Sequence, residues 1–410
     1  MNYLALIGRD GVIFICGFFS SIFLARHLGP DIYGEYILIV LIISYPQQFG
    51  RFSFSQAIIP YLKNNSQHEK IIFSLAFVFS IFLWIIVSTI FLLISNYFTL
   101  FDGYSFWFYP IVLGMIFSEI MMSFVTYALV FQQKYKGLSL ITSLRPILFV
   151  IGIGCLYFLH NIDKNIFSYL FMEFFSLSFV TFIGLYHVRD YINLSFIGYK
   201  RLNLKNYFIT SLKFYLTEIV NFLSAKSVAT FVAGSLSPSS LAFYKLIFNH
   251  FELLRFPNNA IGSMMYPEIA KLEQDEDQRK YILKKISFNF FIYLPILVAA
   301  YFTYPSLVKI FYGDEYLIIS KFFPLVLSFG SIYLVTYPIC HYFSSNGAPH
   351  YSGMHLLFSL ISQIGLVLFF LYEENFSLKS AVLSQLIGFI SYTIIMLITY
   401  KYKKFNQINL

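Results

Sequence analysis

The chain has 410 residues, of which 58% are hydrophobic and only 12% are charged, and its mean hydropathy is +0.70. Soluble domains carry about 25% charged residues, so this composition excludes a soluble protein and predicts one that lies in lipid along its whole length. The net charge of +8 comes from Lys and Arg at the ends of apolar segments. A basic stripe is missing, which excludes nucleic acid as a partner.

A membrane-spanning helix needs about 20 predominantly apolar residues, and the sequence predicts twelve such helices. The first six are 4–27, 36–61, 71–95, 106–132, 138–159 and 166–188. The last six are 206–232, 239–266, 284–311, 319–343, 350–372 and 378–400. The first segment ends in Arg26-His27 rather than at a small-residue cleavage site, so we expect it to remain as a span.

Most Lys and Arg residues between these segments lie in the loops of one side, together with the basic C-terminal end. By the positive-inside rule this asymmetry predicts that both termini are cytoplasmic. Cys16, Cys155 and Cys340 fall inside apolar segments without metal-ligand spacing. Neither a disulfide framework nor a metal site is expected, and the sequence predicts no cofactor.

One stretch of the chain occurs twice. Ala25 to Ile39 returns 208 positions later as Ala233 to Ile247, with proline and tyrosine in register. Each copy lies between one apolar segment and the next. The repeat predicts an all-α integral membrane protein of twelve transmembrane helices in two pseudo-symmetric six-helix lobes, a parallel repeat around a central cavity. The lobes are expected at 1–195 and 196–410.

The first copy also has a local structural interpretation. Gly29 is expected to take the left-handed conformation that closes the first helix, and Pro30 to prevent the helix from continuing. Tyr33 and Tyr36 are expected at headgroup level as interfacial anchors. The motif on this interpretation marks topology and binds no substrate.

Polar and charged residues recur on single faces of several spans, where a charge costs about 2.5–3.5 kcal/mol on insertion scales. We therefore predict a polar cavity. Its cationic substrate-binding residues are predicted to be Arg51, Arg255, Arg9, Arg145, Lys213 and Lys245. Its polar lining is predicted to be Gln48, Ser44, Asn249, Asn259, Thr217 and Asn221. The candidate ion-coupling residues are Glu119, Glu173, Glu218 and Glu252.

An alternative interpretation is that these charges neutralise one another inside the bundle. Glu252 and Arg255 are three residues apart and can pair, and Arg9 and Arg145 can extend to the membrane surface. Basic residues nevertheless outnumber acidic ones within the spans. An excess of positive charge favours an anionic passenger, and the planar fork of arginine suits phosphate.

The turn Ala25-Arg26-x-Leu28-Gly29-Pro30-x-x-Tyr33-Gly34-x-Tyr36 resembles the signature of bacterial polysaccharide flippases of the Wzx type. The region Ser235-x-Ser237-Pro238 through Tyr244, followed by Tyr266-Pro267-Glu268-Ile269-Ala270-Lys271, resembles it too. These flippases belong to the multidrug/oligosaccharidyl-lipid/polysaccharide exporter (MOP) superfamily. The chain departs from the pattern at Ser237, which stands where the first copy has Gly29.

The resemblance implies two six-helix lobes around a cationic cavity, in the bacterial inner membrane. It implies a passenger, undecaprenyl-pyrophosphate-linked oligosaccharide of O-antigen or a similar surface polysaccharide, that crosses from the cytoplasmic to the periplasmic leaflet by alternating access. Arg51 and Arg255 match the cationic cavity positions of the family. Membrane lipids, a polysaccharide polymerase and chain-length machinery are the other partners that it implies.

Two further hypotheses stay open. A cation-coupled multidrug exporter of the same superfamily is disfavoured by the basic spans and by a first helix that offers only Asp10 as a cation site. A membrane polysaccharide polymerase or glycosyltransferase is disfavoured because no outer loop is long enough for a catalytic domain. Recognisable catalytic motifs are also missing, so we do not expect an enzyme.

Overall fold

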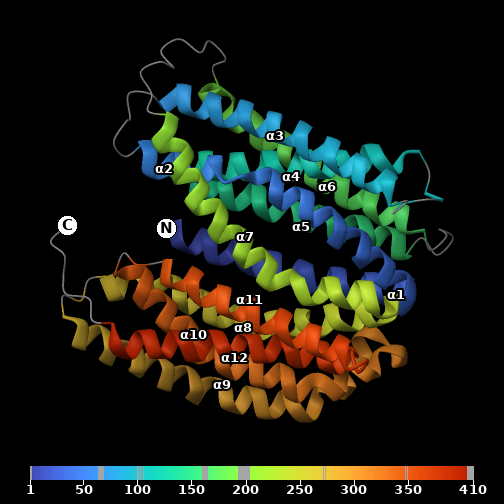
Figure 1. Cartoon of the computed structure of the whole chain (residues 1–410), viewed down its shortest axis with the longest axis vertical. Coiled ribbons are helices and arrows are strands. Elements are labelled where there is room, and N and C mark those ends of the chain that lie inside the picture. The colour runs from blue at the N-terminus through green and yellow to red at the C-terminus, as the bar shows by residue number, and fades with distance from the viewer. Residues whose placement is uncertain are drawn as a thin grey trace. The chain divides into compact units, whose positions relative to one another are not determined.

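The computed structural model describes residues 2–62, 69–98, 101, 103–104, 106–158, 165–192, 204–270, 272, 274–346, 348 and 350–403. The side chains of 2–7, 59–60, 62, 253–264, 266–267, 270, 292, 296, 344, 350 and 352 also lie outside the described part. Regular secondary structure in this part is helical, as Figure 1 shows, without any strand.

The first half contains α1 (Asn2–Arg51), α2 (Phe54–Leu62), α3 (Glu69–Tyr97), α4 (Phe108–Phe131), α5 (Tyr135–Phe158), α6 (Ile166–Val188) and the 3-10 turn Arg189–Tyr191. The second half contains α7 (Leu204–Ser235), α8 (Pro238–Ala270), α9 (Asp275–Tyr312), the 3-10 segment Asp314–Phe322, α10 (Phe323–Ser345), α11 (His350–Tyr372) and α12 (Leu378–Tyr402).

These helices confirm the predicted all-α membrane fold. Among the described residues, nine helical runs are long and apolar enough to cross a membrane, or ten if the pair bent by 41° after Pro295 is counted as one span. The run Gly8–Ile58 covers the first two predicted spans. It is interrupted by a kink at Gly29, with φ 75° and ψ 170°, and by a break between α1 and α2.

The chain forms two compact units. Unit 1 consists of Met1–Phe23 and Ile39–Ile219, and unit 2 of Leu24–Leu38 and Val220–Leu410. Two helices are therefore shared: the middle of α1 packs with unit 2, and α7 passes from unit 1 to unit 2 at Ile219. The lobes expected at 1–195 and 196–410 stay a prediction.

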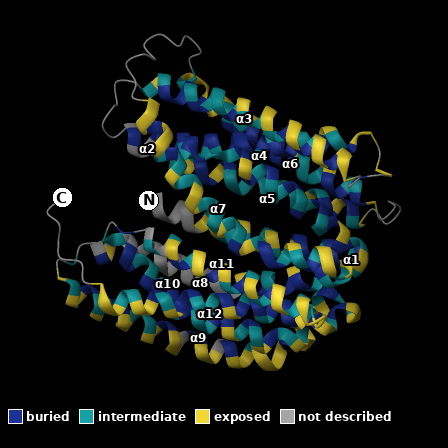
Figure 2. Ribbon diagram, viewed as in Figure 1, coloured by how far each residue is buried: buried dark blue, intermediate teal, exposed yellow. Residues whose placement is uncertain are grey.

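Unit 1 is built around α4, the most buried of its candidate spans. Small residues bring α4 and α6 together: a Cβ on Gly114 would lie 2.3 Å from the Phe174 ring. The other helices expose large apolar residues, among them Phe82 and Leu93 of α3. Exposed positions recur along the α3 ribbon in Figure 2. An apolar exterior over a close-packed interior is what lipid as a solvent requires.

In unit 2 the two copies of the repeated motif contact each other. A Cβ on Gly34 would lie 1.9 Å from the Pro238 carbonyl oxygen, so only glycine permits this approach. Tyr33 and Tyr36 are 3% and 6% exposed and their rings stack with centroids 6.4 Å apart. The expectation that they are interfacial anchors is therefore wrong, because this segment is packed inside unit 2.

The expected conformation of Gly29 is correct in φ but not in ψ. Its φ of 75° is positive, and its ψ of 170° is extended rather than left-handed helical. Residues just before Gly29 contact other parts of unit 2. The Tyr316 hydroxyl donates to the Ala25 carbonyl at 3.0 Å, and Arg26 Nη2 donates to the Ile310 carbonyl at 2.8 Å. The motif thus anchors the helix turn by backbone contacts.

We predict that Gly34→Ala destabilises the protein by about 1–3 kcal/mol, because the new methyl group overlaps a backbone carbonyl that cannot rotate away. The measurement is the thermal unfolding of the detergent-solubilised chain. Gly234→Ala, in α7 with nothing within 4 Å of its Cβ position, is the matched control and should be neutral or slightly stabilising. Equal unfolding temperatures for the two variants would contradict the packing argument.

Candidate functional site

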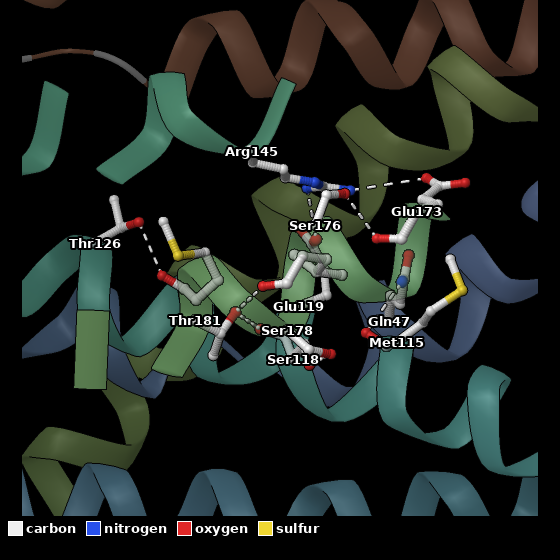
Figure 3. A network of polar contacts seen from close by, with 12 residues as sticks. Gln47, Met115, Ser118, Glu119, Thr126, Arg145, Glu173, Ser176, Ser178 and Thr181 are labelled. Atoms are coloured by element: carbon white, nitrogen blue, oxygen red, sulfur yellow. Dashed lines mark hydrogen bonds and ion pairs between the residues drawn. The ribbon is translucent and has the colours of Figure 1, made fainter. Parts of the chain in front are cut away.

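Four charged side chains from four helices meet inside unit 1. Arg51, the last residue of α1, donates through Nη2 to Glu119 Oε1 of α4. Arg145 of α5 donates through Nη1 to Glu119 Oε2 at 3.0 Å, and its Nη2 lies 3.8 Å from Glu173 Oε1 of α6. Figure 3 shows Arg145 between the two carboxylates. We call Arg51, Glu119, Arg145 and Glu173 the charge cluster.

The register of α1 on α4 explains how Arg51 reaches Glu119. One turn before Arg51, Gln47 donates through Nε2 to the Met115 carbonyl at 3.4 Å. Met115 lies one turn before Glu119, so the two contacts repeat with the same spacing along both helices. Arg145 stands directly before Pro146, which removes one backbone donor from the middle of α5.

The register of α4 on α6 is set by hydroxyl groups beside the cluster (Figure 3). Ser118 and Ser178 share a hydrogen bond of 2.9 Å, and Thr181 Oγ1 donates to the Ser118 carbonyl at 3.1 Å. All three side chains are buried. Hydroxyl pairs of this kind fix contacts between helices in membranes, and here they place Glu119 and Glu173 close together.

The charge cluster is neutral overall, and its arginines are more exposed than its carboxylates. Two guanidinium groups face two carboxylates, and the formal charges cancel. The side chains of Arg51 and Arg145 are 30% and 36% exposed, whereas those of Glu119 and Glu173 are 15% and 16% exposed. The arginines are thus the more accessible members. Arg51 Nε is buried without a partner among the described residues.

The structure brings together only some of the predicted cationic residues. Arg51 and Arg145 share Glu119, so internal pairing accounts for both. Arg9 pairs with its neighbour Asp10 at 2.7 Å, outside the cluster. Lys213 on α7 and Lys245 on α8 are exposed. The side chain of Arg255 lies outside the described residues.

The predicted polar lining is distributed over three helices. In α1, Ser44 donates to the Leu41 carbonyl at 2.6 Å, and Gln48 is buried. In α7, Thr217 and Asn221 are exposed, and the Thr217 hydroxyl bonds the Lys213 carbonyl of its own helix. Asn249 of α8 is half-buried. The side chain of Asn259 lies outside the described residues.

The four predicted ion-coupling carboxylates have different surroundings. Glu119 and Glu173 belong to the charge cluster. Glu218 of α7 accepts a hydrogen bond of 2.9 Å from the Ser53 hydroxyl, and Glu252 of α8 is exposed. Sequence reasoning missed Ser53 and the break that contains it, since neither residue of the break is glycine or proline. It also missed Ser118, Ser178 and Thr181, which carry no signal except being small and polar within spans.

Two planar guanidinium forks on one carboxylate form an arrangement that also fits phosphate. Carboxylate and phosphate oxygens accept the same paired N–H donors from arginine. The donors that Arg51 and Arg145 present to Glu119 are thus of the kind that phosphate oxygens also accept.

Comparison with known proteins gives a family and a fold. The family model described as "Polysaccharide biosynthesis protein" matches residues 23–321. Among curated protein sequences, none matches this chain significantly. The resemblance to a polysaccharide family that the sequence indicates is confirmed by the match to the family model, which covers more than half of the chain.

Several solved structures share the fold. The lipid II flippase MurJ in an inward closed conformation has a TM-score of 0.76 at 15% identity, covering 97% of this chain and 87% of that one. An inward-facing MATE-family multidrug transporter of the MOP superfamily has a TM-score of 0.74 at 13% identity, and the match covers 97% of each chain. A MOP superfamily transporter from Pyrococcus furiosus has a TM-score of 0.66 at 14% identity, and the match covers 97% of this chain and 93% of that one. The chain therefore shares its fold with these membrane proteins.

We predict that Glu119→Gln destabilises the protein by about 1–3 kcal/mol, because it leaves two guanidinium groups facing each other over a neutral amide. The exposure of both arginines keeps this below the cost of breaking a fully buried pair. Combined with Arg145→Gln, the loss should be smaller than the sum of the single losses. Strict additivity in thermal unfolding would show that the cluster is not coupled. Glu373→Gln, a change at an exposed carboxylate, is the control.

Proposed function

This chain belongs to the polysaccharide biosynthesis protein family, and we propose from that premise that it is a flippase for lipid-linked oligosaccharide. It moves an undecaprenyl-pyrophosphate-linked repeat unit, of O-antigen or a similar surface polysaccharide, from the cytoplasmic to the periplasmic leaflet by alternating access. The protein lies in the bacterial inner membrane with both termini cytoplasmic. It is a transporter without a cofactor and not an enzyme.

The observation that supports the proposal is that Arg51 and Arg145 both donate hydrogen bonds to the Glu119 carboxylate. Both guanidinium groups are held within membrane-spanning helices, where an isolated charge is costly, and both are the accessible members of their pairs. A pyrophosphate offers two phosphoryl groups to the two forks, with more acceptor oxygens than the carboxylate that now occupies them. Glu119 thus holds the arginines in place until the substrate arrives.

Protonation of Glu119 or Glu173 would favour this exchange. A protonated carboxyl group no longer competes for guanidinium donors, and each bound proton gives the neutral cluster one positive charge. Proton binding and anion binding at the cluster therefore support each other, and this linkage is reciprocal. Glu218 and Glu252 are the other carboxylates proposed for ion coupling.

The remaining predicted residues complete the proposed path. Arg255 matches the second cationic position of the family, and Arg9, Lys213 and Lys245 add positive charge. Hydroxyl and amide groups suit sugar hydroxyls without selecting one sugar; these are Ser44, Gln48, Thr217, Asn221, Asn249 and Asn259. Membrane lipids surround the lipid tail, and a polysaccharide polymerase with its chain-length machinery would use the product.

A multidrug exporter is the second candidate, favoured by the zero net charge of the cluster. A neutral site rejects cationic drugs less strongly than an unpaired arginine pair would. A drug-sensitivity panel on a deletion strain separates the two functions, since a flippase deletion should alter surface polysaccharide and leave resistance to cationic drugs unchanged.

We predict that Arg51→Ala and Arg145→Ala each reduce surface polysaccharide at least 10-fold in cells whose only copy is the variant. Charge-assisted hydrogen bonds contribute about 1.5–3 kcal/mol each, and 1.4 kcal/mol corresponds to a factor of ten. The measurement is surface polysaccharide per cell, normalised to the abundance of the protein. The matched control is Arg189→Ala, an arginine that is 58% exposed and outside the cluster. Wild-type polysaccharide at normal protein abundance would refute the phosphate site.

A further inference from the structure

The helix that carries Arg51 breaks directly after it. Helix α1 ends at Arg51 and α2 begins at Phe54. The two residues between them, Phe52 and Ser53, have φ values of 39° and 52°. Neither is glycine or asparagine, so both residues are strained in this left-handed region. Strain of this kind persists only where the surroundings enforce it, and it concentrates at functional sites.

Side chains from the first half of α7 contact both residues of the break and the residue that follows them. The Phe52 ring packs on Tyr215, with centroids 4.5 Å apart. The Ser53 hydroxyl donates to Glu218 Oε2 at 2.9 Å. The Phe54 carbonyl accepts a hydrogen bond of 2.7 Å from the Tyr207 hydroxyl. Three successive residues, the two of the break and the first of α2, are thus contacted by one helix.

Of these contacts, the bond to Glu218 is the one that uses a charge. Ser53 is 3% exposed, and Glu218 is half-buried. Within the described part of the chain, Glu218 has no Lys, Arg or His nitrogen within 4.0 Å and accepts the Ser53 hydroxyl instead. A carboxylate at membrane depth is costly, and a charged acceptor makes a hydrogen bond stronger. The Glu218 carboxylate therefore stabilises the backbone conformation next to Arg51.

We propose that Ser53 and Glu218 are positioning residues for Arg51. Their bond holds the left-handed break, the break sets where α1 ends, and the end of α1 sets how the Arg51 guanidinium faces Arg145. This deepens the proposed function and rests on it, because it assigns Arg51 to the substrate pyrophosphate. A displacement of about 1 Å at a reacting or binding group can cost a factor of 100.

The position of Glu218 in the chain gives this bond a second consequence. Residues of α7 up to Ile219 belong to unit 1, and those from Val220 belong to unit 2. Glu218 therefore lies in the last turn of α7 that unit 1 holds. A change in the direction of α7 at this point acts on the break, and through it on Arg51.

The test uses the full-length chain in detergent and measures its affinity for geranylgeranyl pyrophosphate, with geranylgeraniol as the probe without phosphate. Ser53→Ala and Glu218→Ala should each weaken pyrophosphate binding about 10-fold, and the double variant no further, because both act through one bond. Ser53→Asn should bind as the wild type does, since asparagine tolerates the left-handed region and its amide can donate to Glu218.

The variant Ser53→Gly distinguishes a role in positioning Arg51 from a purely structural role. Glycine removes the strain of a positive φ, so the thermal stability should be unchanged or higher while the affinity still falls about 10-fold. If affinity follows stability across the variants, the residues support the fold and do not position Arg51. Thr210→Ala on the same helix, whose hydroxyl bonds the Asn206 carbonyl of α7 itself, is the matched control.

Arg51→Ala distinguishes failure of this inference from failure of the proposed function. If the wild type does not prefer the pyrophosphate probe, or if Arg51→Ala binds it equally well, both are overturned. If Arg51→Ala loses affinity while Ser53→Ala and Glu218→Ala keep it, only the positioning role is overturned.

Discussion

One carboxylate shared by two arginines is the interaction on which unit 1 depends. A guanidinium group buried alone among apolar helices is costly, so Arg51 and Arg145 each need a partner, and Glu119 serves both. Glu173 brings the formal charge of the cluster to zero. Four helices must converge to assemble these groups, which explains why polar contacts between helices concentrate here. The hydrogen bond from Gln47 and the hydroxyl pairs of α4 and α6 all lie within a few turns of Glu119.

The helices that carry the members of the charge cluster differ in how firmly they are packed. The side of Glu119 and Glu173 is rigid, because α4 and α6 approach at small residues and buried hydroxyls, and a close-packed interior does not deform continuously. Arg51 stands at a helix end whose following residues are strained. The register of α1 on α4 places its side chain, and neighbouring side chains hold the break that ends this helix. The cluster thus combines two carboxylates on a close-packed helix pair with one cation at the end of a helix.

The helices could be predicted from the sequence because each is an apolar run ended by charges, and 166–188 and 350–372 agree with α6 and α11 at both ends. The break after Arg51 could not, because Phe52 and Ser53 are ordinary strand or helix residues whose conformation α7 imposes. Pairing within the cluster was one of two interpretations of the sequence. Choosing between them needs the register of α1 on α4, which no spacing along a single helix contains.

Counting charges predicts more basic than acidic residues in the spans, and the structure shows where part of that excess lies. Glu119 and Glu173 are committed to arginines and Glu218 to Ser53. Lys213 and Lys226 of α7 have no carboxylate within 4.0 Å among the described residues. Part of the positive excess among the described residues therefore lies on α7, while the paired arginines form a neutral cluster. For an anionic passenger, long-range attraction would come from α7. Recognition would come from the two guanidinium forks, whose geometry Glu119 maintains.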